Sequence, residues 1–212
     1  MCGKFTQNYT WRQVHAYSNL FAAAAAPEVE AEGAITPMRF ALVLHMADGA
    51  PAVTPMRWGF AGRDDHEPHR PRHMHARAET VDVLPTFAQA FAQRRCVILV
   101  DSFNEGEEIG ARTQQWTITP RNDALIAIAA IYEAWEREGR TLYTFVMVTT
   151  PPNALIGKIT DRMPAILPPH AVETWLKGPP DAAKALLKSF DDQGAWDMHP
   201  QRKKSAQGDL FG

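Results

Sequence analysis

Two apolar runs near the middle of the chain, residues 124–132 and 141–150, constrain the fold more than any other feature of the sequence. Each run is too short to cross a membrane as a helix, which takes about 18 apolar residues or more. Runs of this length and composition are typical of strands that are covered on both faces at the centre of a sheet. We therefore predict a sheet built around these two segments.

Other segments add strands and a few helices to this sheet. Residues 40–46 and 52–60 are strand candidates, and the Asp48-Gly49 pair between them is typical of a hairpin turn. Further strands are predicted at residues 96–100 and 115–119, and helices at residues 11–21 (with Thr10 as N-cap), 84–93, 170–176 and 180–190. Because strands and helices do not alternate strictly, we predict an α+β fold with a largely antiparallel sheet in a single domain around one core.

The polar segment 61–77, rich in His, Arg and Pro, is predicted to be a long surface loop. Arginines outnumber acidic residues between positions 57 and 95, which would suit a groove for a nucleic-acid backbone. Histidines in this segment leave a metal site open as an alternative, but Pro68 and Pro71 interrupt any helix that would align them. These histidines are His66, His69, His73 and His75. We expect no metal and no other cofactor.

Charge and composition exclude several classes of protein. A net charge of -2 argues against a protein that coats nucleic acid through general electrostatics. Hydrophobic residues make up 45% of the chain, as in ordinary globular proteins, and no secretory signal or membrane span is apparent. The two cysteines provide no disulfide framework, and Cys96, inside an apolar strand, is expected to be inert. We expect a monomer in the cytoplasm.

The start of the chain, Met1-Cys2-Gly3, has a specific chemical meaning if Met1 is removed. Cys2 would then carry an α-amine with a pKa of about 7.7 to 8.0 beside a thiol with a pKa of about 8.5. An aldehyde would form a Schiff base with the amine, and the thiol would then close a five-membered thiazolidine ring. The alternative is that Cys2 is a small residue in a frayed terminus.

Several short motifs accompany Cys2 in a fixed order. They are Met1-Cys2-Gly3-Lys4-Phe5, Arg57-Trp58-Gly59-Phe60, Ala76-Arg77-Ala78-Glu79-Thr80, residues 101–105, Asp161-Arg162-Met163-Pro164 and Trp196-Asp197-Met198-His199-Pro200. In order and spacing, the first five, over roughly residues 2–170, resemble the SOS-response-associated peptidase (SRAP) family, the abasic-site processing proteins. The last motif also looks like the late Trp-x-x-His-Pro element of this family. The resemblance implies one domain, residues 1–200, with a mostly antiparallel, strongly curved, barrel-like sheet flanked by helices.

The resemblance also implies an activity. It implies covalent capture of an abasic site in single-stranded DNA by Cys2, which would shield the lesion from strand cleavage, and a self-processing peptidase activity that exposes Cys2. Glu105 would act as the acid and base that assist loss of water from the first adduct. The alternative is that Glu105 belongs to a solvated acidic face together with Glu107 and Glu108.

Six residues correspond to DNA contacts of the family. Arg77 and Arg162 match arginines that contact phosphates beside the lesion, a role suited to the guanidinium fork. Trp58 and Phe60 match an aromatic element on which a base or sugar would stack, with a core role at a strand end as the alternative. The remaining two, which would line the nucleotide pocket, are Pro37 and Thr149.

Three positions depart from the family pattern. The chain has His75 where the family has Asn, Thr160 where it has His, and Gly106 where it has an aromatic residue. Threonine does not replace histidine as a base at neutral pH. We hypothesise that His75 takes over part of this acid/base role from the opposite side of the pocket. The alternative is that the site has drifted and His75 is an ordinary loop residue.

The segment 201–212 is predicted to be a flexible tail. Its end resembles the peptide by which bacterial replication and repair proteins dock on the sliding clamp, with Gln207 fixing the register and Leu210 and Phe211 as anchors. The alternative is a tail with an apolar end of no consequence.

Two other functions compete with capture of abasic sites. One is a cysteine-type peptidase or autopeptidase, in which Cys2 or Thr160 attacks a peptide. The other is a drifted module that binds single-stranded DNA or the clamp reversibly, in a salt-sensitive manner and without a covalent product.

Overall fold

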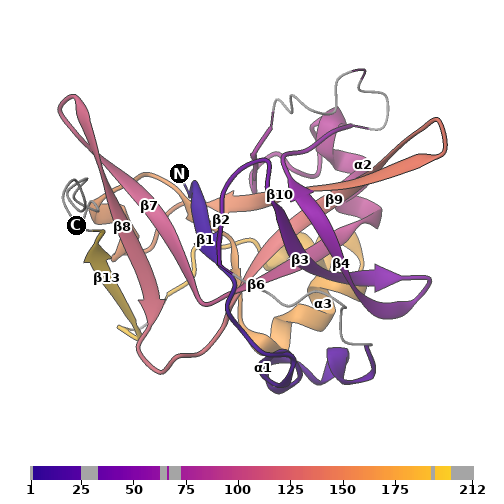
Figure 1. The fold of residues 1–212 in the computed structure, drawn as a ribbon, viewed down its shortest axis with the longest axis horizontal. Coiled ribbons are helices and arrows are strands. Elements are labelled where there is room, and N and C mark those ends of the chain that lie inside the picture. The colour runs from indigo at the N-terminus through magenta and orange to yellow at the C-terminus, as the bar shows by residue number, and fades with distance from the viewer. Residues whose placement is uncertain (1, 25–32, 63–65, 67–72, 192–193, 202–212) are drawn as a thin grey trace, which may run out of the picture.

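A computed structural model describes residues 2–24, 33–62, 66, 73–191 and 194–201, and its centre is a closed β-barrel (Figure 1). Each barrel strand is hydrogen-bonded to two others, and β10 pairs with β9 to complete the ring. In ring order the barrel strands are β3 (Phe40–Ala47), β6 (Arg95–Val100), β9 (Ile126–Arg137), β10 (Arg140–Thr150) and β4 (Ala50–Trp58). The predicted central strands are therefore neighbours in the barrel wall.

Antiparallel pairing dominates the barrel, as the sequence predicted. The exception in the ring is the contact between β4 and β10, which is parallel and pairs Thr144 with Arg57 and Phe145 with Trp58. Three short strands extend the wall: β5 (His75–Arg77) and β11 (Met163–Pro164) pair with β10, and β12 (Ile166–Leu167) pairs with β9. The predicted α+β barrel-like fold is confirmed.

Two tight turns close the hairpins of the barrel. Asp48 and Gly49, between β3 and β4, have φ values of 50° and 80°. Glu138 and Gly139, between β9 and β10, have φ values of 52° and 72°. Two successive residues with positive φ match the twist of antiparallel strands, and glycine adopts this conformation without steric cost. The turn predicted at Asp48-Gly49 is confirmed.

A second sheet lies beside the barrel, with β1 and β2 on the side nearest to it (Figure 1). Its strands, in order across the sheet, are β13 (Trp196–Pro200), β8 (Arg112–Pro120), β7 (Ser102–Ile109), β1 (Lys4–Thr6) and β2 (Ala34–Ile35). The sequence predicted only the β8 strand. Strands β1 and β2 have three and two residues, β7 carries three glutamates, and β13 has only five residues, so their local pattern is weak.

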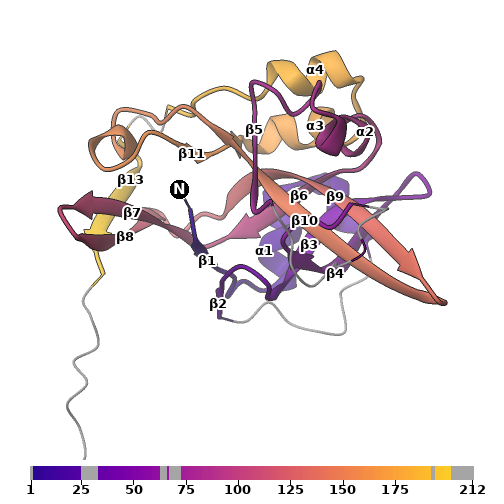
Figure 2. The same ribbon diagram turned by 90° about the horizontal axis from the view of Figure 1, so that it is seen from above.

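The helices are short, and α2, α3 and α4 cover one side of the barrel (Figure 2). Their bounds are α1 (Trp11–Tyr17), α2 (Pro85–Gln93), α3 (Val172–Lys177) and α4 (Pro180–Ala185), with 3-10 turns η1 (Asn19–Ala23), η2 (Ile156–Lys158) and η3 (Pro169–Ala171). Gln13 accepts a hydrogen bond from the Thr10 amide at the start of α1. The predicted helices 11–21 and 180–190 both end early, at Tyr17 and Ala185.

Buried apolar side chains form two clusters, where the sequence predicted one core. Val146 and Val148 of β10 belong to the cluster that also contains the buried faces of α2 and α3. Phe145 and Met147, on the other face of the strand, belong to the second cluster, which includes Cys2. Since β10 is covered on both faces, its sequence reads as a continuous apolar run.

The predicted loop 61–77 is shorter than expected. Its end, from His75, forms strand β5, and Phe60 forms an isolated bridge with His73 across the segment. Within the described residues, no helix has the length and apolar character needed to traverse a bilayer.

Candidate active site

Cys2 is buried immediately before β1, with 1% of its surface exposed. Its thiol donates a hydrogen bond to the Lys4 carbonyl over 3.4 Å. The strand that follows is held on both sides, because Phe5 pairs with Ile35 of β2 and with Phe103 of β7. Burial raises the pKa of the Cys2 thiol well above its usual range, and the charge of a neighbouring carboxylate adds to this effect. The alternative of a frayed terminus does not fit this placement.

The neighbouring carboxyl group is that of Glu105 in β7, which is completely buried. Burial raises the pKa of Glu105 to about 7, although the charge of the amino terminus and a hydrogen bond from the Cys2 amide favour its ionised form. Glu108, in the same strand, is exposed. The alternative that Glu105 belongs to a solvated acidic face is therefore wrong. A carboxyl group with a pKa near neutrality can donate and accept protons at physiological pH.

His75 reaches Cys2 from the barrel side. Its Nε2 atom lies 2.7 Å from the Cys2 carbonyl oxygen, and its ring meets the Trp58 ring edge-on at 5.9 Å between centroids. A carbonyl oxygen only accepts hydrogen bonds, so Nε2 carries the proton and Nδ1 has the free lone pair of the neutral ring. Burial lowers the pKa of His75, which favours this neutral form.

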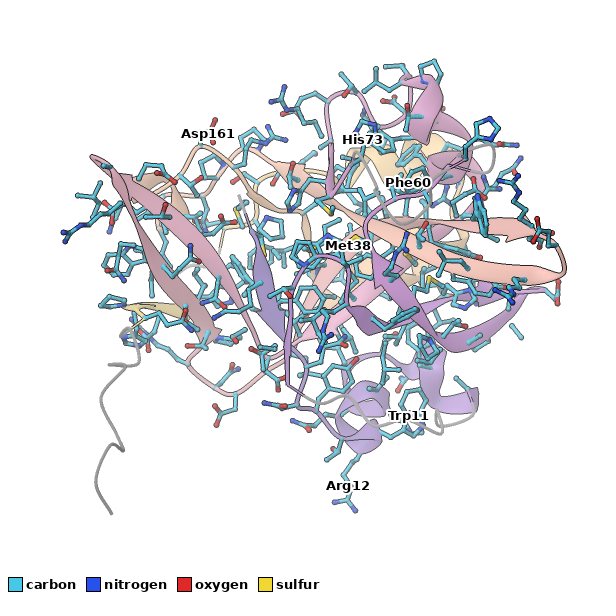
Figure 3. All side chains as sticks on the ribbon, turned by 45° about the horizontal axis from the view of Figure 1, so that its top comes forward. Trp11, Arg12, Met38, Phe60, His73 and Asp161 are labelled. Carbon is cyan, nitrogen blue, oxygen red and sulfur yellow. The ribbon has the colours of Figure 1, made fainter. Side chains whose placement is uncertain are left out.

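Trp58 and Phe60 lie in the core, the placement that was the alternative to a stacking role for both residues. The Trp58 indole donates a hydrogen bond to the Met74 carbonyl over 2.9 Å and packs against Phe5. Phe60 packs against Phe87 of α2 (Phe60 is labelled in Figure 3). A base would stack on either ring only if the core opened. Trp58 instead fixes the segment that carries His75.

Arg162 and Thr149 are in direct contact, and Arg77 lies beside them. The Arg162 guanidinium donates two hydrogen bonds to the Glu79 carboxylate, over 2.6 and 2.9 Å, and one to the Thr149 carbonyl over 2.6 Å. Thr149 is buried and pairs with Arg77 of β5 and Pro164 of β11. Arg77 is exposed. The structure thus joins two of the sequence motifs through the ion pair between Glu79 and Arg162.

Pro37 and Thr160 are the remaining site candidates among the described residues. Pro37 is half-buried in a turn that is attached to the barrel by a hydrogen bond of 2.8 Å from the Met38 amide to the Trp58 carbonyl. The described contacts include no hydrogen bond from the Thr160 side chain to Cys2, Glu105 or His75. Hydrogen bonds among the described residues thus link Glu105 and His75 to Cys2, and none of them joins the Thr160 side chain to it.

Sequence reasoning assigned no role to Asp161, which follows Thr160. Asp161 is exposed (labelled in Figure 3), and its negative charge contributes, after burial, to the raised pKa of Glu105. Glu79 likewise belongs to a sequence motif but had no predicted role of its own. A charge pair between residues far apart in the chain leaves no local signal in a single sequence.

Gly106 borders a polar hollow of about 470 Å³, which neither Cys2 nor Glu105 lines. A Cβ atom at this position would lie 2.8 Å from Cγ2 of Thr113, so glycine allows β8 to pack closely. An aromatic side chain here, as in the family pattern, would displace Thr113. The hollow is lined by Gly3, Lys4, Gly106, Glu108, Thr113 and Gln115.

Other predicted features lie elsewhere or outside the described residues. Arg95, counted in the basic stretch, is buried and donates to backbone carbonyls at the ends of α2 and α3, including that of Phe91. No cluster of metal-binding side chains is found among the described residues, and His69 lies outside them. The proposed clamp anchors Gln207, Leu210 and Phe211 also lie outside the described residues. Gln201, assigned to the tail, donates to the Gln115 carbonyl and so continues the edge of the second sheet.

Taken together, the geometry defines a class: a closed β-barrel with a second sheet, in which a buried cysteine at the second position lies beside a buried carboxyl group and a neutral histidine. The family model described as SOS response associated peptidase (SRAP) matches residues 1–204. The chain belongs to this family.

Relatives and solved structures agree with this assignment. Abasic site processing protein YoqW of Bacillus subtilis is 30% identical over 199 residues, which cover 90% of this chain and 88% of that protein. Abasic site processing protein YoaM of the same organism is 29% identical, covering 90% and 87%. A crystal structure of a protein from Bacteroides thetaiotaomicron, 22% identical, superposes with a TM-score of 0.81 over 95% of this chain and 92% of that one, which supports the fold.

Proposed function

We propose that the chain captures abasic sites in single-stranded DNA as a covalent adduct of Cys2, after removal of Met1. The observation that carries the proposal is the convergence of Glu105 and His75, from two different sheets, on Cys2. The names of the relatives, which are abasic site processing proteins, support the choice of an aldehyde-containing DNA lesion as the target.

The proposed reaction joins one aldehyde to one aminothiol with loss of one water. The α-amine of Cys2 attacks the aldehyde carbon of the opened deoxyribose and forms a carbinolamine. Loss of the hydroxyl group as water gives a Schiff base. The thiol then adds to the carbon of the protonated Schiff base, its proton passing to the Glu105 carboxylate, and closes the thiazolidine ring. Because burial keeps the thiol protonated, the amine reacts first and the thiol second.

Glu105 and His75 have different roles in this scheme. Glu105, with its pKa of about 7, protonates the departing hydroxyl group of the carbinolamine and afterwards accepts the thiol proton. His75 holds the Cys2 carbonyl through Nε2 and so orients the residue that reacts, while Nδ1 is available as a base. In this scheme His75 supplies part of the acid/base function that the threonine at position 160 does not provide.

DNA would be held beside Cys2 by the residues that match the family pattern. Arg77 and Arg162 contact phosphates on the two sides of the lesion, and Pro37 and Thr149 line the space for the sugar. No stacking is assigned to Trp58, because its ring is buried.

The test is incubation with single-stranded DNA that carries one abasic site, followed by a denaturing gel and intact mass. We expect a 1:1 adduct whose mass is the sum of both molecules minus one water, and which persists without a reducing agent. Cys2→Ala, and a chain with an extra residue inserted before Cys2, should form no such adduct. Cys96→Ala, a matched control at the other cysteine, should react like the wild type. Absence of the adduct in the wild type would refute the proposal.

The same experiment separates the competing functions. A peptidase would turn over unrelated peptides, whereas a drifted binding module would release DNA in salt without any covalent product. The monomeric state, the cytoplasmic location and the domain boundary near residue 200 stay predictions.

A further inference from the structure

Glu79 and Arg162 form an ion pair with the geometry of phosphate recognition. Both terminal nitrogens of Arg162 are used: Nη1 donates to Oε1 of Glu79 over 2.6 Å and Nη2 to Oε2 over 2.9 Å. A carboxylate bound in this way presents two oxygens to the guanidinium fork, as a phosphate does. The arginine that we assign to a DNA phosphate is therefore already occupied by an anion of the protein itself.

The backbone of Glu79 is held firmly in place. The Ala78 amide donates to the Thr149 carbonyl over 2.8 Å, and the Val81 amide donates to the Arg77 carbonyl over 2.9 Å. Lys184 of α4 donates to the Glu79 carbonyl over 3.3 Å from the other side. The backbone position of Glu79 is thus set by the fold, and it keeps the Glu79 side chain within reach of Arg162.

The two partners differ in exposure. The Arg162 side chain is 12% exposed, and Thr149 also holds its Nη2 atom, whereas the Glu79 side chain is 48% exposed. Glu79 can therefore turn into water at little cost, while Arg162 stays where it is. Arg77 lies close enough for its charge to favour the ionised form of Glu79.

We propose that Glu79 is an internal competitor for the DNA phosphate on Arg162, so that DNA binds only by displacing the Glu79 carboxylate. This inference rests on the proposed function, because it takes a DNA phosphate as the ligand of Arg162. Glu79 keeps the guanidinium oriented in the free protein and cancels its charge, which lowers affinity for intact single strands. A lesion that reacts with Cys2 is retained by the covalent bond, whereas intact DNA is released. Glu79 is thus a specificity-determining residue.

The test uses an undamaged single-stranded oligonucleotide and measures its affinity by fluorescence anisotropy at several salt concentrations. Glu79→Gln keeps an oxygen that accepts from Arg162 but removes the charge. We expect it to bind about two- to fivefold tighter than the wild type, from the usual strength of such ion pairs. The slope of log affinity against log salt should stay close to that of the wild type, because Arg162 contacts a phosphate in both complexes.

Two controls separate competition from a general change in charge. Glu136→Gln removes an exposed carboxylate near the tip of the β9–β10 hairpin, away from β1 (Figure 1), and should leave affinity unchanged. In an Arg162→Ala background, Glu79→Gln should have no effect on DNA affinity, because the guanidinium for which Glu79 and DNA compete is absent. Thermal unfolding of each variant confirms that it is folded.

Affinity that is weaker or unchanged in Glu79→Gln would overturn the inference, as would the same gain in the Arg162→Ala background. Absence of DNA binding in both wild type and Glu79→Gln would overturn it as well. These results are distinguishable from failure of the proposed function, which is read separately from the Cys2-dependent adduct with abasic DNA.

Discussion

Replacing Glu105 by glutamine should stabilise the protein at high pH, even though it removes a group of the proposed reaction. Glu105 is completely buried in β7, and burial raises its pKa from the ordinary value of 4.5 to about 7. Below pH 4.5 the carboxyl group is neutral in both the folded and the unfolded chain. Above pH 7 it is ionised in both, and only the folded chain bears the cost of a buried charge.

The magnitude follows from the two pKa values. One pKa unit corresponds to about 1.4 kcal/mol, so the difference between 4.5 and about 7 corresponds to about 3 kcal/mol of unfolding free energy. The unfolding free energy of the wild type is therefore higher by this amount below pH 4.5, and the amount is lost as the pH rises to 7 and beyond. Glutamine is neutral throughout and still accepts the hydrogen bond from the Cys2 amide.

The assay is urea unfolding of wild type and Glu105→Gln from pH 4.5 to pH 9, on chains whose N-terminal processing is checked by mass. At pH 4.5 we expect similar stability, and at pH 8 we expect the variant to be more stable by about 3 kcal/mol. Glu108→Gln, at an exposed site in the same strand, should show no such pH dependence. A difference between wild type and Glu105→Gln that stays constant with pH would refute the reasoning. The variant should also form the DNA adduct about a hundredfold more slowly.

Three further predictions concern the surroundings of Cys2 and the tail. His75→Ala should slow adduct formation about tenfold, because one hydrogen bond to the Cys2 carbonyl is lost. Because burial lowers the pKa of His75, no inflection from this residue should appear above pH 7 in the pH-rate profile; unchanged kinetics in His75→Ala would contradict its role. Trp58→Phe leaves the Met74 carbonyl without its donor and should lower the unfolding free energy by about 1–3 kcal/mol in urea, whereas unaltered stability would argue against this hydrogen bond. Deletion of residues 207–212 should abolish capture by the immobilised sliding clamp; equal capture would refute the docking peptide.

Local pattern was enough to predict much of the barrel. Strands β9 and β10 and the turn at Asp48-Gly49 follow from apolar runs and from turn residues that accept positive φ. Helix α2 was found in the same way. These features depend on residues within about one turn or hairpin of each other, so a single sequence contains them.

Apart from β8, the strands of the second sheet could not be predicted from local pattern. Strand β1 has three residues and β2 has two, and β7 carries acidic residues that read as solvent-exposed. Strands β1 and β2 form because each pairs with a segment that lies far along the chain, whereas β7 pairs both with the distant β1 and with its neighbour β8. The family motifs indicated Glu105 as a partner of Cys2, but its complete burial, and therefore its raised pKa, depends on this pairing.

The sequence by itself determined the chemistry that is available: an aminothiol at Cys2 if Met1 is removed, a histidine at position 75 and arginines at 77 and 162. The tertiary structure decided how these groups are used. It placed His75 on the Cys2 carbonyl, buried Trp58 in the core, where the sequence left both a stacking and a core role open, and paired Arg162 with Glu79. The physical reason is that burial and charge pairing arise between residues distant in the chain. The spacing of apolar residues along a helix or strand does not reveal such contacts.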